Sequence, residues 1–234
     1  MKNLQTNHPV TLPPKIIFWG GTGQAKVNRP IVEYYGSKVV AVFDDTPGLK
    51  SPFSDVEMHQ GWEGFLRWKK SQKEMNDFGF CIAIGNPHGR VRLKLHERLV
   101  NEGLHPISLI HPTAFIDETV LFDDGLQVMA GAIIQPEVRI GRQCIINTKV
   151  SVDHECILED GVELAPGVTL CGNVYVETNG WICAGATVLP RMRIGHDSIV
   201  GAGSVVIRDI PSEFVAYGIP AKNIRRIIFD ERAV

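Results

Sequence analysis

Three adjacent residues, Asp153, His154 and Glu155, combine side chains that are suited to proton transfer. A histidine beside a carboxylate can act as a general base, because the acid fixes the tautomer of the imidazole and stabilises its protonated form. A lone surface histidine usually has no such role. Whether His154 can act as a base therefore depends on the structural element in which it lies.

His154 lies inside a long repeat, which runs from Ile110 to Val206. Every sixth residue of this stretch is large and apolar, seventeen times in succession, with no insertion or deletion. A period of six fits neither a helix nor an isolated strand and is the hexapeptide signature of a parallel β-helix. Three hexapeptides form one triangular coil, with each sixth residue inside. His154 follows the inward Val152 by two positions, so we expect it to project outward near a corner.

A second group of candidate residues lies before the repeat, where predicted strands end. The strands are expected at residues 15–19, 38–43, 79–84 and 106–110, with helices at 24–35, 62–75 and 90–102. The carboxyl ends of parallel strands share one edge of a sheet, so their loops predict a ligand crevice there. The residues of these loops are Gly20, Gly21, Thr22, Gly23 and Gln24, then Asp44 and Asp45, then Gly85.

The glycine turn at residues 20–24 favours a phosphate ligand, because glycines let the backbone approach closely and a helix N-terminus follows. The third glycine of the dinucleotide fingerprint is missing, and Lys26 stands in its place. We expect a nucleotide other than NAD, because the unit is too short for two mononucleotide halves before the repeat begins. A tight turn with solvated acids is the alternative.

The sequence thus predicts a small parallel α/β domain of Rossmann type followed by a β-helix of hexapeptide repeats. We expect a flexible arm at residues 1–14, the α/β domain at 15–109, the β-helix at 110–210 and a C-terminal cap at 211–234. The net charge of −2 makes nucleic acid an improbable partner. No signal peptide, membrane span or CxxC pair is recognisable, which favours a cytoplasmic protein with reduced cysteines. The histidines of the repeat are too far apart for a metal site.

Six segments taken in order resemble one family, and the match covers residues 15 to about 227. They are the glycine turn, the strand ending Asp-Asp, Ile-Gly-Asn (84–86), the Asn147 to Glu155 segment, Ala-Pro-Gly-Val-Thr-Leu-Cys-Gly-Asn (165–173) and Gly-Ile-Pro-Ala-Lys (218–222). The chain resembles the bacterial nucleotide-sugar acetyltransferases. These include enzymes that N-acetylate UDP-4-amino-4,6-dideoxy sugars and GDP-perosamine, and relatives of the sialic acid O-acetyltransferase type.

The resemblance implies a left-handed β-helix, acetyl-CoA as donor, no metal, a homotrimer and a nucleotide-linked 4-amino sugar as acceptor. It implies that His154 is the general base and Glu155 its orienting acid. Substrate contacts are implied for Asn147 and for the loop residues named above. Cofactor contacts are implied for Glu163, Gly172, Ala184, Ala202 and Lys222, with the Gly172 amide near the thioester carbonyl.

Two positions depart from the family pattern, because Gln24 and Glu163 stand where the family usually has histidines. Gln24 can still donate a hydrogen bond to a phosphate. An ionised Glu163 cannot donate and would repel an anionic cofactor. The sequence does not name the nucleotide base or the sugar.

Two alternative functions stay open. A sugar O-acetyltransferase of the sialic-acid type could use the same base on a hydroxyl group. A non-catalytic β-helix binding module would need only the repeat, since a fold does not imply a function.

Overall fold

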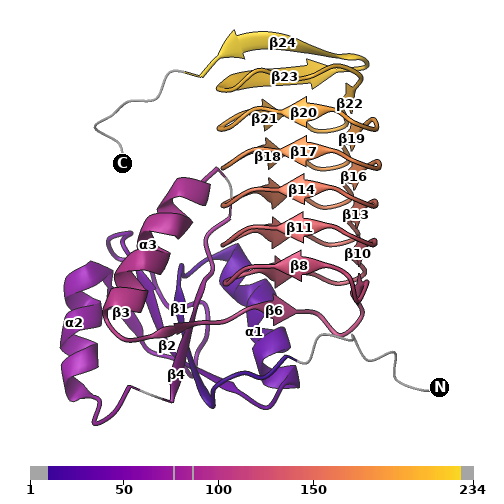
Figure 1. Ribbon diagram of the computed structural model, residues 1–234. Coiled ribbons are helices and arrows are strands. Elements are labelled where there is room, and N and C mark those ends of the chain that lie inside the picture. Colours follow the sequence, from indigo (N-terminus) through magenta and orange to yellow (C-terminus); the bar gives the residue numbers. More distant parts are fainter. Residues whose placement is uncertain (1–9, 76, 86, 228–234) are drawn as a thin grey trace. The chain divides into compact units, whose positions relative to one another are not determined.

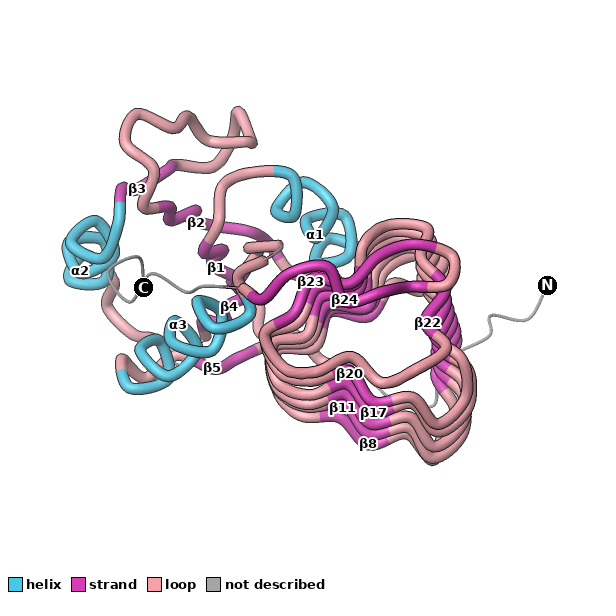
Figure 2. Tube along the Cα trace, turned by 90° about the horizontal axis from the view of Figure 1, so that it is seen from above, coloured by secondary structure: helices cyan, strands magenta, loops and turns pink. Residues whose placement is uncertain are grey.

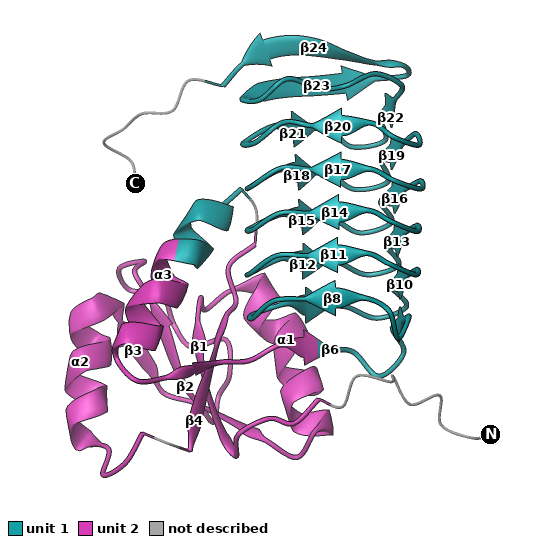
Figure 3. Cartoon of the chain, viewed as in Figure 1, with its two compact units in different colours: residues 1–9, 86–93, 110–234 teal, residues 10–85, 94–109 magenta. Residues whose placement is uncertain are grey.

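The computed structural model describes residues 10–75, 77–85 and 87–227. Contacts within the chain divide it into two compact units (Figure 3). The α/β unit comprises residues 10–85 and 94–109, and the β-helix unit comprises the described residues 87–93 and 110–227. Parts of two predicted segments, residues 1–9 of the arm and 228–234 of the cap, lie outside the described residues. Asn86, the last residue of the Ile-Gly-Asn segment, also lies outside them.

The α/β unit contains a parallel five-stranded sheet in the order β3-β2-β1-β4-β5 (Figure 1). Its strands are β1 Lys15–Trp19, β2 Lys38–Asp44, β3 Met58–Gln60, β4 Phe78–Ile82 and β5 His105–Pro106. Helices α1 (Gly23–Tyr34) and α2 (Gly61–Ser71) lie on opposite sides of this sheet (Figure 2). Apart from Lys15 at the start of β1, the central strands β1 and β4 are apolar and buried, as expected for a parallel sheet with both faces covered.

The predicted strands and helices of this unit are confirmed with shifted ends. Helix α2 ends at Ser71 rather than residue 75, because Gln72 is extended. Helix α3 spans Gly89–Asn101. The strand predicted at 106–110 is wrong as a single element: β5 pairs with β4, whereas β6 (Leu109–Ile110) pairs with β9 in the β-helix. The short β3 was not predicted, since three residues show no usable periodicity.

Three sheets form the three faces of the β-helix, which is triangular in cross-section (Figure 2). The strands of its repeat are two residues long. The first sheet contains β6, β9 Gln127–Val128, β12 Ile145–Ile146, β15 Glu163–Leu164, β18 Trp181–Ile182 and β21 Ile199–Val200. The second contains β7 Phe115–Ile116, β10 Ile133–Ile134, β13 Ser151–Val152, β16 Thr169–Leu170, β19 Thr187–Val188 and β22 Val205–Val206. The third contains β8 Leu121–Phe122, β11 Arg139–Ile140, β14 Ile157–Leu158, β17 Tyr175–Val176 and β20 Arg193–Ile194. An antiparallel pair, β23 (Phe214–Gly218) and β24 (Ala221–Arg226), extends the first sheet beyond β21.

The predicted inward positions are confirmed, because sixteen of the seventeen are at most 3% exposed. The exception is Phe122, which is half-buried. It lies in β8, the terminal strand of its sheet, so no further coil covers it on that side. The six-residue period therefore specifies the prism interior almost without error.

The corners of the prism impose a second six-residue period on the backbone. Fourteen consecutive corner positions from Gly125 to Gly203 have positive φ, between 56° and 79°. Glycine occupies six of them, since only glycine adopts this conformation without steric cost. At the corner that contains His154, however, all four such positions carry side chains. They are Glu137, Glu155, Asn173 and Arg191.

We predict that Gly185→Ala lowers the free energy of unfolding by about 1–2 kcal/mol, measured in urea. The φ of Gly185 is +67°, and a Cβ there would meet no atom within 4 Å, so only the backbone conformation is penalised. Lys149→Ala is the matched control, because Lys149 already has a φ of 58° with a side chain. Equal effects of the two substitutions would contradict this explanation of the glycine pattern.

Candidate active site

His154 lies at the corner between β13 and β14, with its backbone fixed and its side chain half exposed. Its backbone N–H donates to Asp153 Oδ1 at 2.8 Å, and its carbonyl accepts from Asn173 N at 2.8 Å. The imidazole Nδ1 lies 3.0 Å from Glu155 Oε2. An ionised carboxylate only accepts hydrogen bonds, so Nδ1 carries the proton and Nε2 keeps its lone pair. The predicted base and its orienting acid are therefore brought together.

Gly172 lies directly against the imidazole, one coil of eighteen residues further along. A Cβ on Gly172 would lie 2.5 Å from His154 Nε2 and 2.6 Å from Cε1, so only glycine leaves room for the ring. A groove of about 440 Å³ opens at this point. The residues that line it come from three successive coils: Asp153, His154, Glu155, Cys171, Gly172, Asn173, Pro190 and Arg191.

The backbone N–H of Gly172 is a further polar group at this groove. The equivalent corner N–H groups of Arg142, His154 and Thr178 donate to carboxylates, as does that of His196. Within the described part of the chain, no such acceptor binds the N–H of Gly172. A free, fixed donor beside a base is the arrangement that stabilises an oxyanion in acyl transfer.

The other residues of the β-helix unit that were predicted to contact the sugar or CoA do not line the groove of His154. Asn147 is at the neighbouring corner, between β12 and β13, where its Oδ1 accepts from Thr148 N at 2.8 Å. Ala184 and Ala202 occupy that same corner in later coils. Lys222 is exposed in β24. One chain thus places His154, Glu155 and Gly172 at one edge of the prism, and Asn147, Ala184 and Ala202 at another.

The side chain of Glu163 does not line this groove, and its predicted cofactor contact stays a prediction. Glu163 is 4% exposed and its Oε2 accepts from Arg92 Nη1 at 3.3 Å. Arg92 is fully buried and also donates to the carbonyls of Gln143 and Gly161, at 3.0 and 2.8 Å. The Glu163 carboxylate is therefore occupied by an internal ion pair. Sequence reasoning missed Arg92, whose place in an amphipathic helix gives no sign of a buried partner.

The predicted loops of the α/β unit do converge around the glycine turn. Gly20 has a φ of +107°, and a Cβ there would lie 2.3 Å from the carbonyl oxygen of Ala83. The carboxylate of Asp44 accepts hydrogen bonds from Gly21 N at 2.8 Å and from Thr46 N at 2.9 Å. Both carboxylate oxygens are therefore bonded to backbone N–H groups. Asp45 is exposed. The structure thus gives Asp44 a loop-positioning role and leaves Asp45 accessible to a ligand.

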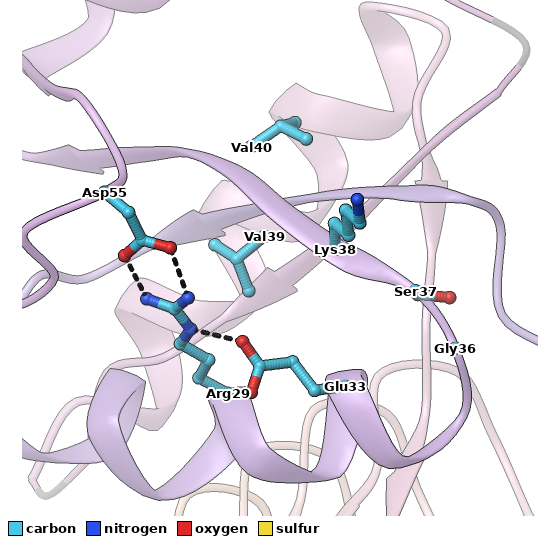
Figure 4. A pocket seen from close by; sticks show the side chains of 8 residues that line it. All are labelled: Arg29, Glu33, Gly36, Ser37, Lys38, Val39, Val40 and Asp55. Atoms are coloured by element: carbon cyan, nitrogen blue, oxygen red, sulfur yellow. Dashed lines mark hydrogen bonds and ion pairs between the residues drawn. The ribbon is translucent and has the colours of Figure 1, made fainter.

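A larger hollow of about 690 Å³ in the α/β unit is a weaker candidate (Figure 4). The guanidinium of Arg29, which lines this hollow, donates to Asp55 Oδ1 at 2.6 Å and to Glu33 Oε1 at 2.6 Å. Lys38, also in its lining, begins β2, so this hollow lies at the opposite strand ends from the glycine turn. Its arginine is already neutralised, so it offers little to an anionic ligand.

The described residues contain neither a candidate metal site nor a candidate membrane span. Within residues 10–75, 77–85 and 87–227, no three His, Cys, Asp or Glu side chains are grouped so that they could hold a metal ion. In the same residues, no helix has the length and apolar character needed to cross a membrane.

We predict that Gly172→Ala reduces kcat at least about tenfold, because the new methyl group displaces the base from its position. Thermal stability should change little, since the φ of Gly172 is not positive and the neighbour is a half-exposed side chain. Combining Gly172→Ala with His154→Ala should cost no more activity than His154→Ala alone. Additive losses would show that Gly172 does not act through the imidazole.

We also predict an effect of pH on stability through Glu163. Burial raises the pKa of Glu163 to about 7, against the attraction of Arg92. Burial also lowers the pKa of Arg92, but an arginine stays protonated. The folded state therefore binds the Glu163 proton more tightly than the unfolded state, and this stabilisation is lost as pH rises through about 7.

The measurement is the free energy of unfolding of the wild type minus that of Glu163→Gln, between pH 4 and 8. This difference should be largest at low pH and fall as pH rises. A difference that increases with pH would mean that the ion pair outweighs the cost of burial.

Comparisons with known proteins identify the family to which the chain belongs. Residues 15–99 match the family model of the PglD N-terminal domain. The GDP-perosamine N-acetyltransferase of Escherichia coli O157:H7 is 30% identical over 153 residues, which are 63% of this chain and 68% of that protein.

Two solved structures cover almost the whole fold. PerB from Caulobacter crescentus, solved with CoA and GDP-perosamine, has a TM-score of 0.81 and 32% identity, covering 90% of this chain and 97% of that one. The acetyltransferase domain of PglB from Neisseria gonorrhoeae, solved with acetyl coenzyme A, has a TM-score of 0.79 and 26% identity, covering 90% and 99%. The predicted fold class, an α/β domain followed by a left-handed β-helix, is confirmed. The chain is an acetyltransferase and belongs to the family of the nucleotide-sugar N-acetyltransferases.

Proposed function

We propose that this protein transfers the acetyl group of acetyl-CoA to the amino group of a nucleotide-linked 4-amino-4,6-dideoxy sugar, with His154 as general base. The observation that carries the proposal is the contact between His154 and Gly172. It places a basic Nε2 and a free backbone N–H side by side at an open groove. The relatives solved with CoA, acetyl-CoA and GDP-perosamine support the choice of substrates.

The chemistry follows from the two groups that face the groove. The amine nitrogen of the sugar attacks the thioester carbonyl carbon, and His154 Nε2 accepts the proton that the nitrogen loses. Glu155, 3.0 Å from Nδ1, stabilises the imidazolium that forms. The Gly172 N–H donates to the oxyanion of the tetrahedral intermediate. The intermediate then collapses to the amide and releases the CoA thiolate, which is a good leaving group because a thiol pKa is only about 8.5.

The α/β unit supplies a site for the nucleotide of the acceptor. Helix α1 begins at Gly23, so the backbone N–H groups of its first turn follow directly from the glycine turn. Asp44 holds that turn through Gly21 N, and the exposed Asp45 can accept a hydrogen bond from a base N–H. These features support a nucleoside diphosphate, without selecting uracil, thymine or guanine.

A homotrimer would complete the site, because one chain carries the predicted contacts on two different edges. Large apolar side chains are exposed on the two faces that meet at the His154 edge and on that edge itself. They are Phe115, Leu121, Ile133, Ile157, Leu189 and Ile207. Burial of these residues against a second copy would stabilise the assembly. To complete the site, the assembly must bring the Asn147 edge of one subunit beside the His154 edge of another.

The direct test is release of free thiol from acetyl-CoA in the presence of UDP-, GDP- and dTDP-linked 4-amino sugars. Turnover with one of them is expected, with an N-acetylated product by mass spectrometry. Turnover with free sialic acid and none with the amino sugars would favour the O-acetyltransferase instead. Calorimetry that detects no binding of acetyl-CoA would favour a non-catalytic binding module.

We predict that His154→Ala loses most of its turnover, about 10²–10⁴-fold in kcat, while its affinity for acetyl-CoA stays within about twofold of the wild type. Glu155→Gln should lose less, because the amide can still orient the ring but does not stabilise the imidazolium. A kcat of His154→Ala close to that of the wild type would refute the assignment of the base.

A further inference from the structure

Arg191 lines the His154 groove, yet none of the roles assigned above involves it. It occupies the same corner position as Glu155 and Asn173, two coils beyond Glu155, so about 10 Å separates Arg191 from Glu155 along the prism. Its backbone N–H donates to the carbonyl of Gly172 at 3.1 Å. Arg191 is therefore adjacent to the glycine that the catalytic imidazole covers.

The guanidinium of Arg191 is exposed and uncommitted. Among the described residues it has no hydrogen-bond or ion-pair partner, whereas two other arginines of the β-helix are neutralised. Arg142 pairs with Asp160 at 2.7 Å, and Arg193 pairs with Glu177 at 2.5 Å. Of the eight residues that line the groove, Arg191 is the one permanent cation.

The other charged residues of the groove, Asp153 and Glu155, are acidic and would repel an anionic ligand. A ligand that carries phosphate therefore needs a positive group on this side of the groove. Arg191 is positioned to supply it, since a guanidinium binds phosphate oxygens with two parallel hydrogen bonds.

The backbone of Arg191 has a φ of 65°, a conformation that costs a residue other than glycine about 1–2 kcal/mol. Glycine occupies six of the ten equivalent positions at the other two corners and none of the four at this one. A strained, exposed residue beside a catalytic base is consistent with selection for its side chain.

We propose that Arg191 binds a phosphate group of a substrate in the His154 groove. This inference rests on the proposed function, in which both substrates carry a diphosphate: the nucleotide-linked sugar and acetyl-CoA. The shared chemistry is a phosphate ester, and the experiment separates the two sources.

The test compares Arg191→Gln and Arg191→Lys with the wild type. KM and kcat are measured for each substrate, and Kd is measured for CoA and for UDP or GDP. Arg191→Gly is a third variant that should fold at least as well, because glycine relieves the positive φ. Lys70→Gln, which removes one exposed positive charge from α2, is the control for net charge.

Arg191→Gln and Arg191→Gly should raise KM and Kd roughly 10- to 100-fold for one substrate, with Arg191→Lys intermediate and Lys70→Gln unchanged. A rise for the nucleotide-sugar and the nucleoside diphosphate identifies the acceptor as the source, and a rise for acetyl-CoA and CoA identifies the donor. Unchanged KM and Kd in a wild type that turns over would overturn the inference and leave the proposed function intact. A fall in kcat alone would also overturn it, since the cation would then act on the oxyanion. A wild type that binds neither CoA nor a nucleoside diphosphate would overturn both.

Discussion

The hydrogen bonds between successive coils are the interaction on which the site depends. Each strand from β6 to β19 pairs in parallel with the strand eighteen residues further along, as Ile145 does with Glu163. Equivalent positions of neighbouring coils are therefore stacked about 4.8 Å apart. Residues eighteen positions apart therefore form a column of side chains. A residue at one corner lies between the residue eighteen positions before it and the residue eighteen positions after it. His154 contacts Gly172 for this reason, and Arg191 lies in the column of Glu155.

This stacking places the proposed active site on regular structure rather than on loops. The backbone of His154 is held by the Asp153 carboxylate and by Asn173 N, so the imidazole needs only Glu155 to fix its orientation. Such a site is organised before the substrate binds, which lowers the reorganisation needed in the transition state. The cost is local strain at the positive-φ corners, four of which carry side chains at this edge. The rest of the prism tolerates that cost because its interior is continuously apolar.

The sequence predicted the prism and the pairing of His154 with Glu155, because these features depend on strict periodicity and on neighbours in the chain. The inward residues follow from the six-residue period, and Glu155 is adjacent to His154. The eighteen-residue register would also have identified Arg191 as a member of the Glu155 column. The Arg92–Glu163 pair could not be predicted, since its partners are 71 residues apart and come from different elements. A cofactor contact was expected for Glu163 because the family usually has a histidine at this position. The position is outward in the repeat, but an outward residue can still be covered by another segment of the chain.

The proposed function requires that acyl transfer takes place at the His154 edge, between Nε2 and the Gly172 amide. The most direct test of this requirement is a crystal structure with CoA and a nucleotide-linked 4-amino sugar bound together. We expect the sugar amine to lie within hydrogen-bond distance of His154 Nε2 and the CoA sulfur to lie beside Gly172. A CoA thiol or a sugar amine bound away from this edge, for instance in the hollow lined by Arg29 and Asp55, would contradict it.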